Sequence, residues 1–439
     1  GRTVRTLSAG SDVKTCTEMG VCEENATIAV DEEYDHLGRR VRVSRPRILD
    51  DSVTPKHHEE IAYDAAGREV SRLQPEGLLI ETTYAGLRTV RSDGVRLTVT
   101  QRDGRGRITD VTEDPVGTET AYEYGPFGVT TVVQINGQSA ETTTTIHDAY
   151  GRVIEHHDPD QGTTTTLYNG YGEPRATTDA LGRTVTLTRD GIGRVIVRQD
   201  DDGTSVYEYD TAPNGKGRPA AQTLLLQGTT VNERRTTYDE FGRIAGTTMD
   251  RGGEIFASEV SYDEHGRPFE LSYPDDGSGT RFKVKNVYDS RGNLEAVDGM
   301  RLGNGLFEIP GYQRLWQLRG VHPSGQTRLE EFGNGVETRT DINPATGAIA
   351  EIETLSPAQF GSVQALTYDY DTRGNLQRRG DTLQNTAGVI TGVSEWFEHD
   401  ALGRLTCTRV AEGDFEPQGP CALAVDYKPN GNIDSKSDV

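Results

Sequence analysis

The sequence predicts an all-β protein that folds as one long, curved antiparallel sheet. Residues 39–43 and 183–188 alternate between apolar and polar side chains, which is typical of strands. Glycine occurs 51 times, well above ordinary usage, and this indicates frequent tight turns. No long stretch places apolar residues at the three- and four-residue spacing of a helix, so we expect very little helix.

The composition favours a sheet without a thick core. Only 33% of the residues are hydrophobic and the formal net charge is −23, values that also occur in disordered chains. Disordered chains have no reason to alternate, however, and a sheet wetted on both faces needs little apolar core. The acidic balance argues against nucleic acid as a partner, because binding phosphates requires clustered Lys and Arg. No apolar stretch approaches the roughly 20 residues needed to span a membrane.

A turn motif recurs along the whole chain. Asp-x-x-Gly-Arg or Asp-x-x-Gly-Asn occurs eleven times, and tyrosine directly precedes the aspartate in six copies. Anchor glycines in the middle of the chain lie 22, 23, 21 and 21 residues apart, at Gly106, Gly128, Gly151, Gly172 and Gly193. The six complete copies comprise Tyr34, Asp35, Gly38, Arg39; Tyr63, Asp64, Gly67, Arg68; Tyr238, Asp239, Gly242, Arg243; Tyr262, Asp263, Gly266, Arg267; Tyr288, Asp289, Gly292, Asn293; and Tyr370, Asp371, Gly374, Asn375.

The residue types of the motif predict its local structure. Aspartate at the start of a turn can accept hydrogen bonds from backbone N–H groups two residues on, and glycine supplies the positive φ that closes the turn. Tyrosine ends the incoming strand and Arg or Asn starts the outgoing one, so each unit reads as strand, turn, strand, and successive units pair. The residue before the glycine is often apolar and is expected to tuck under the turn, as at Leu37, Tyr150, Leu181, Ile192, Phe241 and Leu402.

This motif and its period resemble the YD repeat of the Rhs family, which includes bacterial polymorphic toxins, the B and C components of Tc toxins and the animal teneurins. The resemblance covers nearly the whole chain. It implies a sheet that spirals into a hollow shell, and in the family that shell encloses a toxic polypeptide carried at the C-terminus.

Residues 1–439 are accordingly predicted to form one continuous array of repeats, cut at both ends. Self-cleavage and toxicity are not carried over, because the family's core segment and toxin domain are not recognisable here. Residues 295–345 match the repeat least well and hold a denser apolar patch around Trp316. We expect this segment to form strands with longer loops that pack against the main sheet.

Four cysteines fall into two close pairs, Cys16 with Cys22 and Cys407 with Cys421. Each pair brackets a polar, turn-rich stretch, so a local disulfide is the favoured interpretation. Free thiols are the alternative, because spacing alone does not determine the redox state.

The motifs of common enzyme classes are not found, and no cofactor is expected. The stretch from Asp158 through Asp160 to Gly162 resembles the start of a calcium loop, but Asn169 stands where the bidentate glutamate belongs. A plain acidic turn is therefore favoured over a calcium site. The structural role of the motif aspartates, capping turns, is likewise favoured over acid/base catalysis.

The function expected from these observations is structural and not enzymatic: a segment of shell wall in a larger, secreted or cell-surface bacterial protein. Its partners would be the flanking repeats and the enclosed toxin of the same polypeptide. The alternative is an adhesive module that binds cell-surface glycans.

Overall fold

The computed structural model describes residues 2–437 except for 10–13, 17–21, 24–25, 50–56, 127, 136–137, 276, 278, 303–308, 359–361, 382–391, 414 and 429–430. Within the described residues all extended regular structure is β-strand, which confirms the all-β fold class. No helix in this part of the chain is long and apolar enough to cross a membrane.

The strands follow one another at short intervals. The first group is β1 (Arg2–Ala9), β2 (Lys14–Cys16), β3 (Cys22–Glu23), β4 (Thr27–Tyr34), β5 (Arg40–Ser44), β6 (Arg47–Ile48), β7 (His58–Tyr63), β8 (Glu69–Leu73), β9 (Leu79–Ala85), β10 (Arg88–Ser92), β11 (Leu97–Arg102), β12 (Ile108–Asp114), β13 (Thr118–Gly125), β14 (Gly128–Ile135), β15 (Gln138–His147), β16 (Val153–Asp158), β17 (Gly162–Tyr168), β18 (Pro174–Thr178) and β19 (Thr184–Arg189). The second group is β20 (Val195–Asp200), β21 (Gly203–Tyr209), β22 (Pro219–Leu226), β23 (Thr229–Tyr238), β24 (Ile244–Arg251), β25 (Glu254–Tyr262), β26 (Pro268–Asp275), β27 (Arg281–Tyr288), β28 (Leu294–Leu302), β29 (Ile309–Val321), β30 (Thr327–Phe332), β31 (Glu337–Ile342), β32 (Ile349–Leu355), β33 (Ser362–Tyr370), β34 (Leu376–Asp381), β35 (Val393–His399), β36 (Leu405–Glu412), β37 (Leu423–Tyr427) and β38 (Ile433–Lys436).

From β7 to β38 each strand pairs antiparallel with the next strand in the sequence. The start of the chain is less regular, because β1 pairs with β4, while β5 and β6 both pair with β4. This ladder is the predicted succession of paired hairpins.

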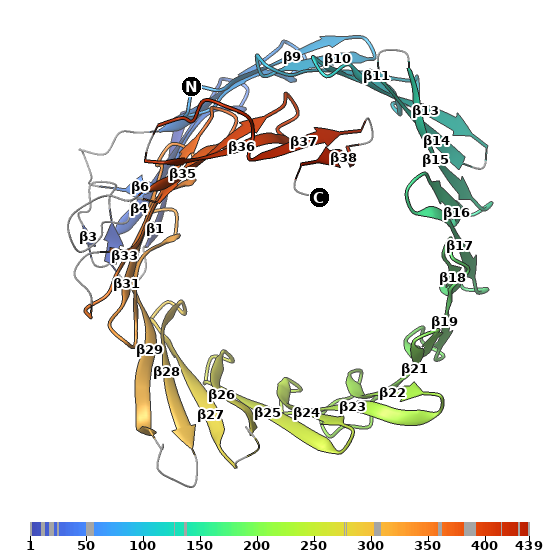
Figure 1. Cartoon of the computed structure of the whole chain (residues 1–439), viewed down its shortest axis with the longest axis vertical. Helices are drawn as coiled ribbons and strands as arrows, with labels where there is room; N and C mark the ends of the chain where they lie inside the picture. Colours follow the sequence, from blue (N-terminus) through green and yellow to red (C-terminus); the bar gives the residue numbers. More distant parts are fainter. Residues whose placement is uncertain are drawn as a thin grey trace.

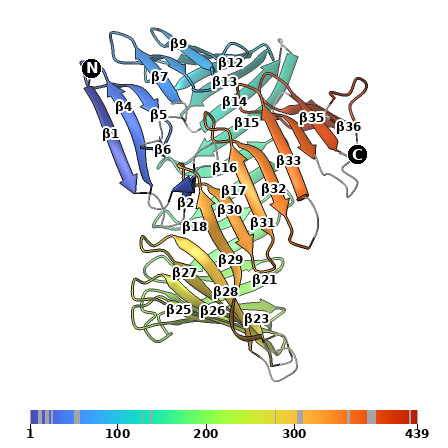
Figure 2. The ribbon, with the colours of Figure 1, turned by 90° about the vertical axis from the view of Figure 1, so that its left-hand side faces the viewer.

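The ribbon of strands winds round a central axis (Figure 1). After one circuit β29 returns beside the beginning of the chain, where it pairs in parallel with β2 through Lys14 opposite Gly320 and Thr15 opposite Val321. We call β1–β28 the first coil and β29–β38 the second coil. Seen from the side, the second coil lies displaced along the axis from the first (Figure 2).

The ribbon has two different rims, because strands alternate in direction and every second turn therefore lies on the same side. One side, which we call the motif rim, carries the turns of the Asp-x-x-Gly type at 35–39, 64–68, 103–107, 148–152, 190–194, 239–243, 263–267, 289–293, 371–375 and 400–404. The other side, the connector rim, carries the remaining hairpin connections, such as 93–96 and 158–162. The turn 179–183 matches the motif but lies on the connector rim.

Apart from residues 303–308, which lie outside the described part of the structure, the segment 295–345 forms part of the sheet and does not pack against it, as the sequence suggested. Strands β28 to β31 pair in order with their neighbours. Register shifts interrupt the pairing of β28 with β29 and of β29 with β30.

The sheet is a single layer over most of its length. Most described strand residues are half-buried or exposed, and the one cluster of buried apolar residues found among them is Ala26, Ile28 and Ile48. Hydrogen bonds between neighbouring strands, together with side-chain contacts along each face, therefore hold most of the sheet together.

Candidate functional site: the turn clasp and the seam between coils

Each motif turn is closed by its own aspartate. In the turn 239–243, one carboxylate oxygen of Asp239 accepts hydrogen bonds from the backbone N–H groups of Phe241 (3.0 Å) and Arg243 (2.8 Å). The other oxygen accepts one from Arg243 Nε (2.7 Å). Gly242 has φ of +75°, the left-handed conformation that a turn of this kind requires. The carboxylate–arginine bond is repeated at Asp35, Asp64, Asp103, Asp148, Asp179, Asp190, Asp263 and Asp400.

These hydrogen bonds lower the pKa of several motif carboxylates, among them Asp64, Asp148 and Asp179. At Asp148, the bond from the Arg152 side chain lowers the pKa, with the backbone N–H groups of Arg152 and Tyr150 acting in the same direction and partial desolvation opposing them. A carboxylate engaged in this way is a turn cap, and its pKa moves away from the range that acid/base catalysis at neutral pH needs.

The arginine of each turn also reaches the next repeat. The Arg243 guanidinium lies 4.2 Å from the ring centroid of Tyr262, and the Tyr262 hydroxyl donates to the carbonyl of Ile244 (2.9 Å). We call this arrangement of aspartate, arginine and following tyrosine the turn clasp. Arginine–tyrosine stacking also joins Arg39 to Tyr63, Arg68 to Tyr84, Arg107 to Tyr124, Arg152 to Tyr168, Arg194 to Tyr209, Arg218 to Tyr238, Arg267 to Tyr288, and Arg404 to Tyr427.

One turn replaces both members of the stacked pair together. Glu173 stands in the arginine position, and Arg189 stands in the tyrosine position of the next repeat, where it forms an ion pair with Glu173 at 3.8 Å. Arg189 also donates to the carbonyl of Pro174 (3.4 Å), the bond that tyrosine makes elsewhere. Matched replacement of this kind was the signal in the sequence that could have revealed the contact between repeats.

The asparagine copies make a reduced clasp. The side-chain amides of Asn293 and Asn375 donate to Asp289 (2.9 Å) and Asp371 (2.8 Å). The tyrosine position of the repeat that follows Asn375 is His399. Asparagine is thus sufficient to close the turn but carries no guanidinium to stack on a ring.

Two motif tyrosines lie outside this scheme. Tyr34 donates its hydroxyl to Glu32 (2.9 Å). The motif turn that precedes Tyr370 is 343–347, and Ala348 stands where other turns carry arginine, so that turn provides no guanidinium to stack on the Tyr370 ring. Burial raises the pKa of the Tyr370 hydroxyl.

The apolar residues before the turn glycines are at the surface, and the expectation that they tuck under the turn is wrong. The side chains of Leu37, Tyr150, Leu181, Ile192 and Phe241 are 64% to 85% exposed, and Leu402 is half-buried. The aspartate and arginine of the clasp close the turn from within, so these side chains point outward from the rims.

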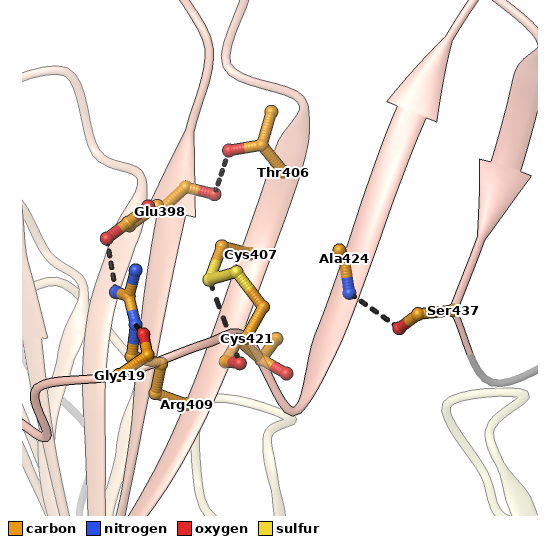
Figure 3. Close-up of a disulfide and its surroundings, with 9 residues drawn as sticks. Glu398, Thr406, Cys407, Arg409, Gly419, Cys421, Ala424 and Ser437 are labelled. Atoms are coloured by element: carbon orange, nitrogen blue, oxygen red, sulfur yellow. Dashed lines mark hydrogen bonds and ion pairs between the residues drawn. A yellow bond between two sulfur atoms is a disulfide. The ribbon is translucent and has the colours of Figure 1, made fainter.

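Cys407 and Cys421 are joined in a disulfide, with Cα atoms 5.4 Å apart (Figure 3). The bond ties the end of the connection 413–422 back to β36, and Arg409 supports the same loop by donating to the carbonyl of Gly419 (3.1 Å). Cys16 and Cys22 are partners in the register of β2 and β3, but their side chains lie outside the described part of the structure. That second disulfide stays a prediction.

The two coils meet along a seam that joins the connector rim of the first to the motif rim of the second. Arg45 donates to the carbonyl of Ala345 (2.9 Å), across 300 residues. Asp93 pairs with Arg373 (3.2 Å). Further along, Asn432 donates to Asp160. These contacts, together with the short parallel pairing of β2 with β29, make the spiral a stacked structure.

Burial is concentrated where the coils first overlap. Thr15 and Ile28 of the first coil and Val321 and His322 of the second are all less than 9% exposed, and all four line one cleft of about 310 Å³. His322 also bonds the carbonyl of Thr340 through Nε2 (2.9 Å). The seam is therefore a packed interface at its beginning.

The acidic turn 158–162 is organised by its own backbone. One oxygen of Asp158 accepts from the N–H groups of Asp160 (2.9 Å) and Gln161 (2.8 Å). Within the described residues, no group of three or more His, Cys, Asp or Glu side chains is arranged to hold a metal ion. Asp158 therefore caps the turn, and the side chain of Asp160 in the same turn accepts a hydrogen bond from Asn432 of the second coil.

Comparison with known proteins places this geometry in a structural class. No protein-family model matches the chain, and a search of curated proteins finds no relative. Among solved structures, TcdB2-TccC3 without its hypervariable C-terminal region aligns with 99% of the chain at a TM-score of 0.74 and 17% identity. The TcdB2-TccC3 crystal structure aligns with 98% at 0.73 and 17%, and a Tc holotoxin pore of Photorhabdus luminescens with 97% at 0.69 and 16%.

The chain thus has the coiled, single-layer fold of a YD-repeat sheet. More particularly, it is similar to the Rhs/YD shell of the Tc toxin complexes TcdB2-TccC3, so the resemblance drawn from the motif is confirmed in the fold. The chain spans 25% of the length of those chains.

Proposed function

We propose that this chain is a section of the wall of a hollow YD-repeat shell, which encloses an effector polypeptide within a larger secreted protein. The observation that carries the proposal is the single-layer ribbon that completes a circuit and stacks on itself through the seam between Asp93 and Arg373. A sheet without a second layer on either face separates an inside from an outside, which is the property that a container needs.

The chemistry of the repeats supports a structural role. The motif aspartates are engaged by backbone N–H groups and by arginine, and the arginines are in turn stacked on tyrosines. Residues that cap and cross-link turns in this way contribute rigidity, and a rigid wall protects what it surrounds.

The fold comparison supports the same proposal, because the similar sheets belong to assemblies that contain TcdB2 and TccC3. We infer by this analogy that the partners of the chain are other segments of its own polypeptide or complex, and that it works outside the cell.

Two experiments test the proposal. Small-angle scattering of the chain should give a radius of gyration above the roughly 22 Å of a compact chain of this length. Electron cryomicroscopy of the protein expressed from its complete gene should show density for a polypeptide inside the coil. A solid globular scattering profile would contradict the wall. An empty interior, together with selective binding on a glycan array, would favour the adhesive alternative.

A further inference from the structure

The connection between β36 and β37 interrupts the regular ladder of strands. On one side β36 pairs with β35 along its whole length. On the other side, among the described residues, β37 pairs with it only through Cys407 opposite Ala424 and Thr408 opposite Leu423. Residues 409–412 of β36 therefore have a strand partner on one side and a loop on the other.

Residues 415–421 of that loop, which we call the strap, return the chain from β36 to β37. In the described part of the chain two ties fix the strap to β36: the disulfide between Cys421 and Cys407, and a hydrogen bond from Arg409 Nε to the carbonyl of Gly419 (3.1 Å) (Figure 3). Most residues of the strap are exposed, and Phe415 is 84% exposed. Because the strap buries so little of its surface, its position depends on these two ties.

A cleft of about 640 Å³ lies beside the strap. Its lining includes Glu416 of the strap, Glu398 and Arg409 of the adjoining strands, and Arg373 and Val95 at the seam between the coils. The strap therefore borders a hollow that extends from β36 to the seam.

The motif-rim end of β37 is held independently of the disulfide. The Tyr427 hydroxyl donates to the carbonyl of Leu405 (2.8 Å), and the Arg404 guanidinium lies 4.5 Å from the centroid of the Tyr427 ring. Val425, in the middle of the strand, is only 5% exposed. These contacts keep β37 in place at the motif rim when the strap is released.

We propose that the strap is a redox-controlled closure in the wall, shut by the disulfide between Cys407 and Cys421 and opened by reduction of that disulfide. The inference rests on the shell-wall function proposed above and adds a means of regulating it. Disulfides persist outside the cell and are reduced in the cytosol by glutathione and thioredoxin. The closure stays shut while the protein is extracellular, and in a reducing compartment the strap moves away and widens the cleft.

Cys421 is the residue that a reductant reaches first, because it is half-buried whereas Cys407 is 3% exposed. The thiolate of one glutathione attacks Cys421 Sγ, and the S–S bond breaks with Cys407 leaving as a thiolate that takes up a proton. The thiolate of a second glutathione attacks the mixed disulfide, which gives glutathione disulfide and the protonated Cys421 thiol. Two glutathione thiols are oxidised and one protein disulfide is reduced, so the reaction is balanced.

The first experiment measures backbone hydrogen exchange of the folded chain by mass spectrometry, before and after treatment with a phosphine reductant. Exchange should become about tenfold faster or more at 419–424, where the Ala422 N–H donates to the carbonyl of Thr408 (2.7 Å). It should change little around Tyr427. The reference is the hairpin of β20 and β21, which contains no cysteine and should exchange at the same rate throughout.

Two variants support this measurement. Cys16→Ser/Cys22→Ser is the background in which the reductant acts only on the other cysteine pair. Adding Cys407→Ser/Cys421→Ser should give fast exchange at 419–424 with or without the reductant. Unchanged exchange at 419–424 in a fully reduced chain would refute the closure. Equally accelerated exchange in the hairpin of β20 and β21 would also refute it, because reduction would then loosen the whole sheet.

The second experiment tests whether the natural reductant acts on the folded protein. The chain is incubated with millimolar reduced glutathione, and free thiols are alkylated at intervals and mapped. Cys407 and Cys421 should both become alkylated without denaturant, and urea below the unfolding transition should hardly change the rate. A disulfide that glutathione reduces only in the unfolded chain would overturn the redox control. Failure of either experiment leaves the enclosure proposal standing, because that proposal is tested by density inside the coil of the complete protein.

Discussion

Glu173 and Arg189 form an ion pair at the place where most other repeats stack arginine on tyrosine. The pair preserves both functions of the standard contact. It links one turn to the next repeat, and through Arg189 it reaches the carbonyl of Pro174. The link between repeats therefore tolerates different chemistry as long as the two positions change together.

Changing only one member of this pair should destabilise the sheet. Glu173→Arg would place two guanidinium groups side by side and should cost about 1 kcal/mol. The double variant Glu173→Arg/Arg189→Tyr rebuilds the common stacked pair and should recover that loss. Denaturation midpoints of the two singles and the double give the coupling energy. Arg175→Tyr, an exposed position on β18, is the control and should change stability by less than about 0.5 kcal/mol. Additive effects of the two substitutions would contradict the pairing.

Gly242 should tolerate no side chain. Its φ of +75° is unfavourable for a β-branched residue, and a Cβ there would lie 3.3 Å from Arg218 Nε. Gly242→Val should therefore cost about 1–3 kcal/mol, and the damage should extend to neighbouring repeats. Gly104→Val is the matched turn control, since Gly104 has no positive φ and open space at its Cβ position. Equal melting temperatures for the two variants would show that the backbone argument is wrong.

His322 should make the seam sensitive to mild acid. Desolvation lowers the pKa of His322 in the folded chain, with Arg328 and Arg339 acting in the same direction, while the Thr340 carbonyl and Asp341 oppose the shift. The unfolded chain then binds the proton more readily, so stability is full above the ordinary histidine pKa of about 6.5 and decreases as the pH falls below it.

The slope is limited to about 1.4 kcal/mol per pH unit, the value for one proton. Melting curves between pH 7.5 and pH 5.5 should show a smaller loss in His322→Gln than in the wild-type chain; part of the loss should remain, because burial also lowers the pKa of His57. The control is His265→Gln at an exposed turn, which should keep the wild-type slope. An identical slope in His322→Gln would assign the acid sensitivity to other groups.

Both cysteine pairs should be oxidised in protein isolated from an oxidising compartment. The bond between Cys407 and Cys421 closes a loop with a sequence separation of 14. Loops of this length correspond to about 3 kcal/mol in the chain-entropy model, so Cys407→Ser/Cys421→Ser should unfold more easily by that order. Non-reducing peptide mapping should recover this pair and also Cys16 with Cys22. Alkylation of all four thiols without prior reduction would contradict the prediction.

The sequence was sufficient to predict those structural features that depend on contacts between residues close to one another in the chain. Aspartate and glycine at a fixed spacing were enough to predict the turns, because Asp239 and Gly242 act within five residues. The contact between Arg243 and Tyr262 spans 19 residues and depends on strand register, so the motif alone did not reveal it. The outward position of Leu37 was missed because apolar character was taken to mean burial.

The seam was beyond sequence reasoning altogether. Asp93 and Arg373 are separated by 280 residues, and their meeting depends on the accumulated twist and curvature of every strand between them. A small change in curvature per strand would bring a different pair of turns together.

The positions of the seam contacts also describe the shape of the wall. Along the ribbon, in which β5 pairs directly with β7 and β6 pairs back onto β4, the circuit from Arg45 to Ala345 contains 25 described strands, β7 to β31. The circuit from Asp93 to Arg373 contains 23, β11 to β33, and that from Asp160 to Asn432 contains 21, β17 to β37. At a spacing of about 4.8 Å per strand, the loss of four strands shortens the perimeter by about 19 Å. The coil is therefore a cone that narrows toward the C-terminal strands, and β37 and β38 lie inside the ring drawn by β9–β11 (Figure 1). A taper of this kind would close a vessel at one end without a separate lid, simply by using fewer hairpins in each successive circuit.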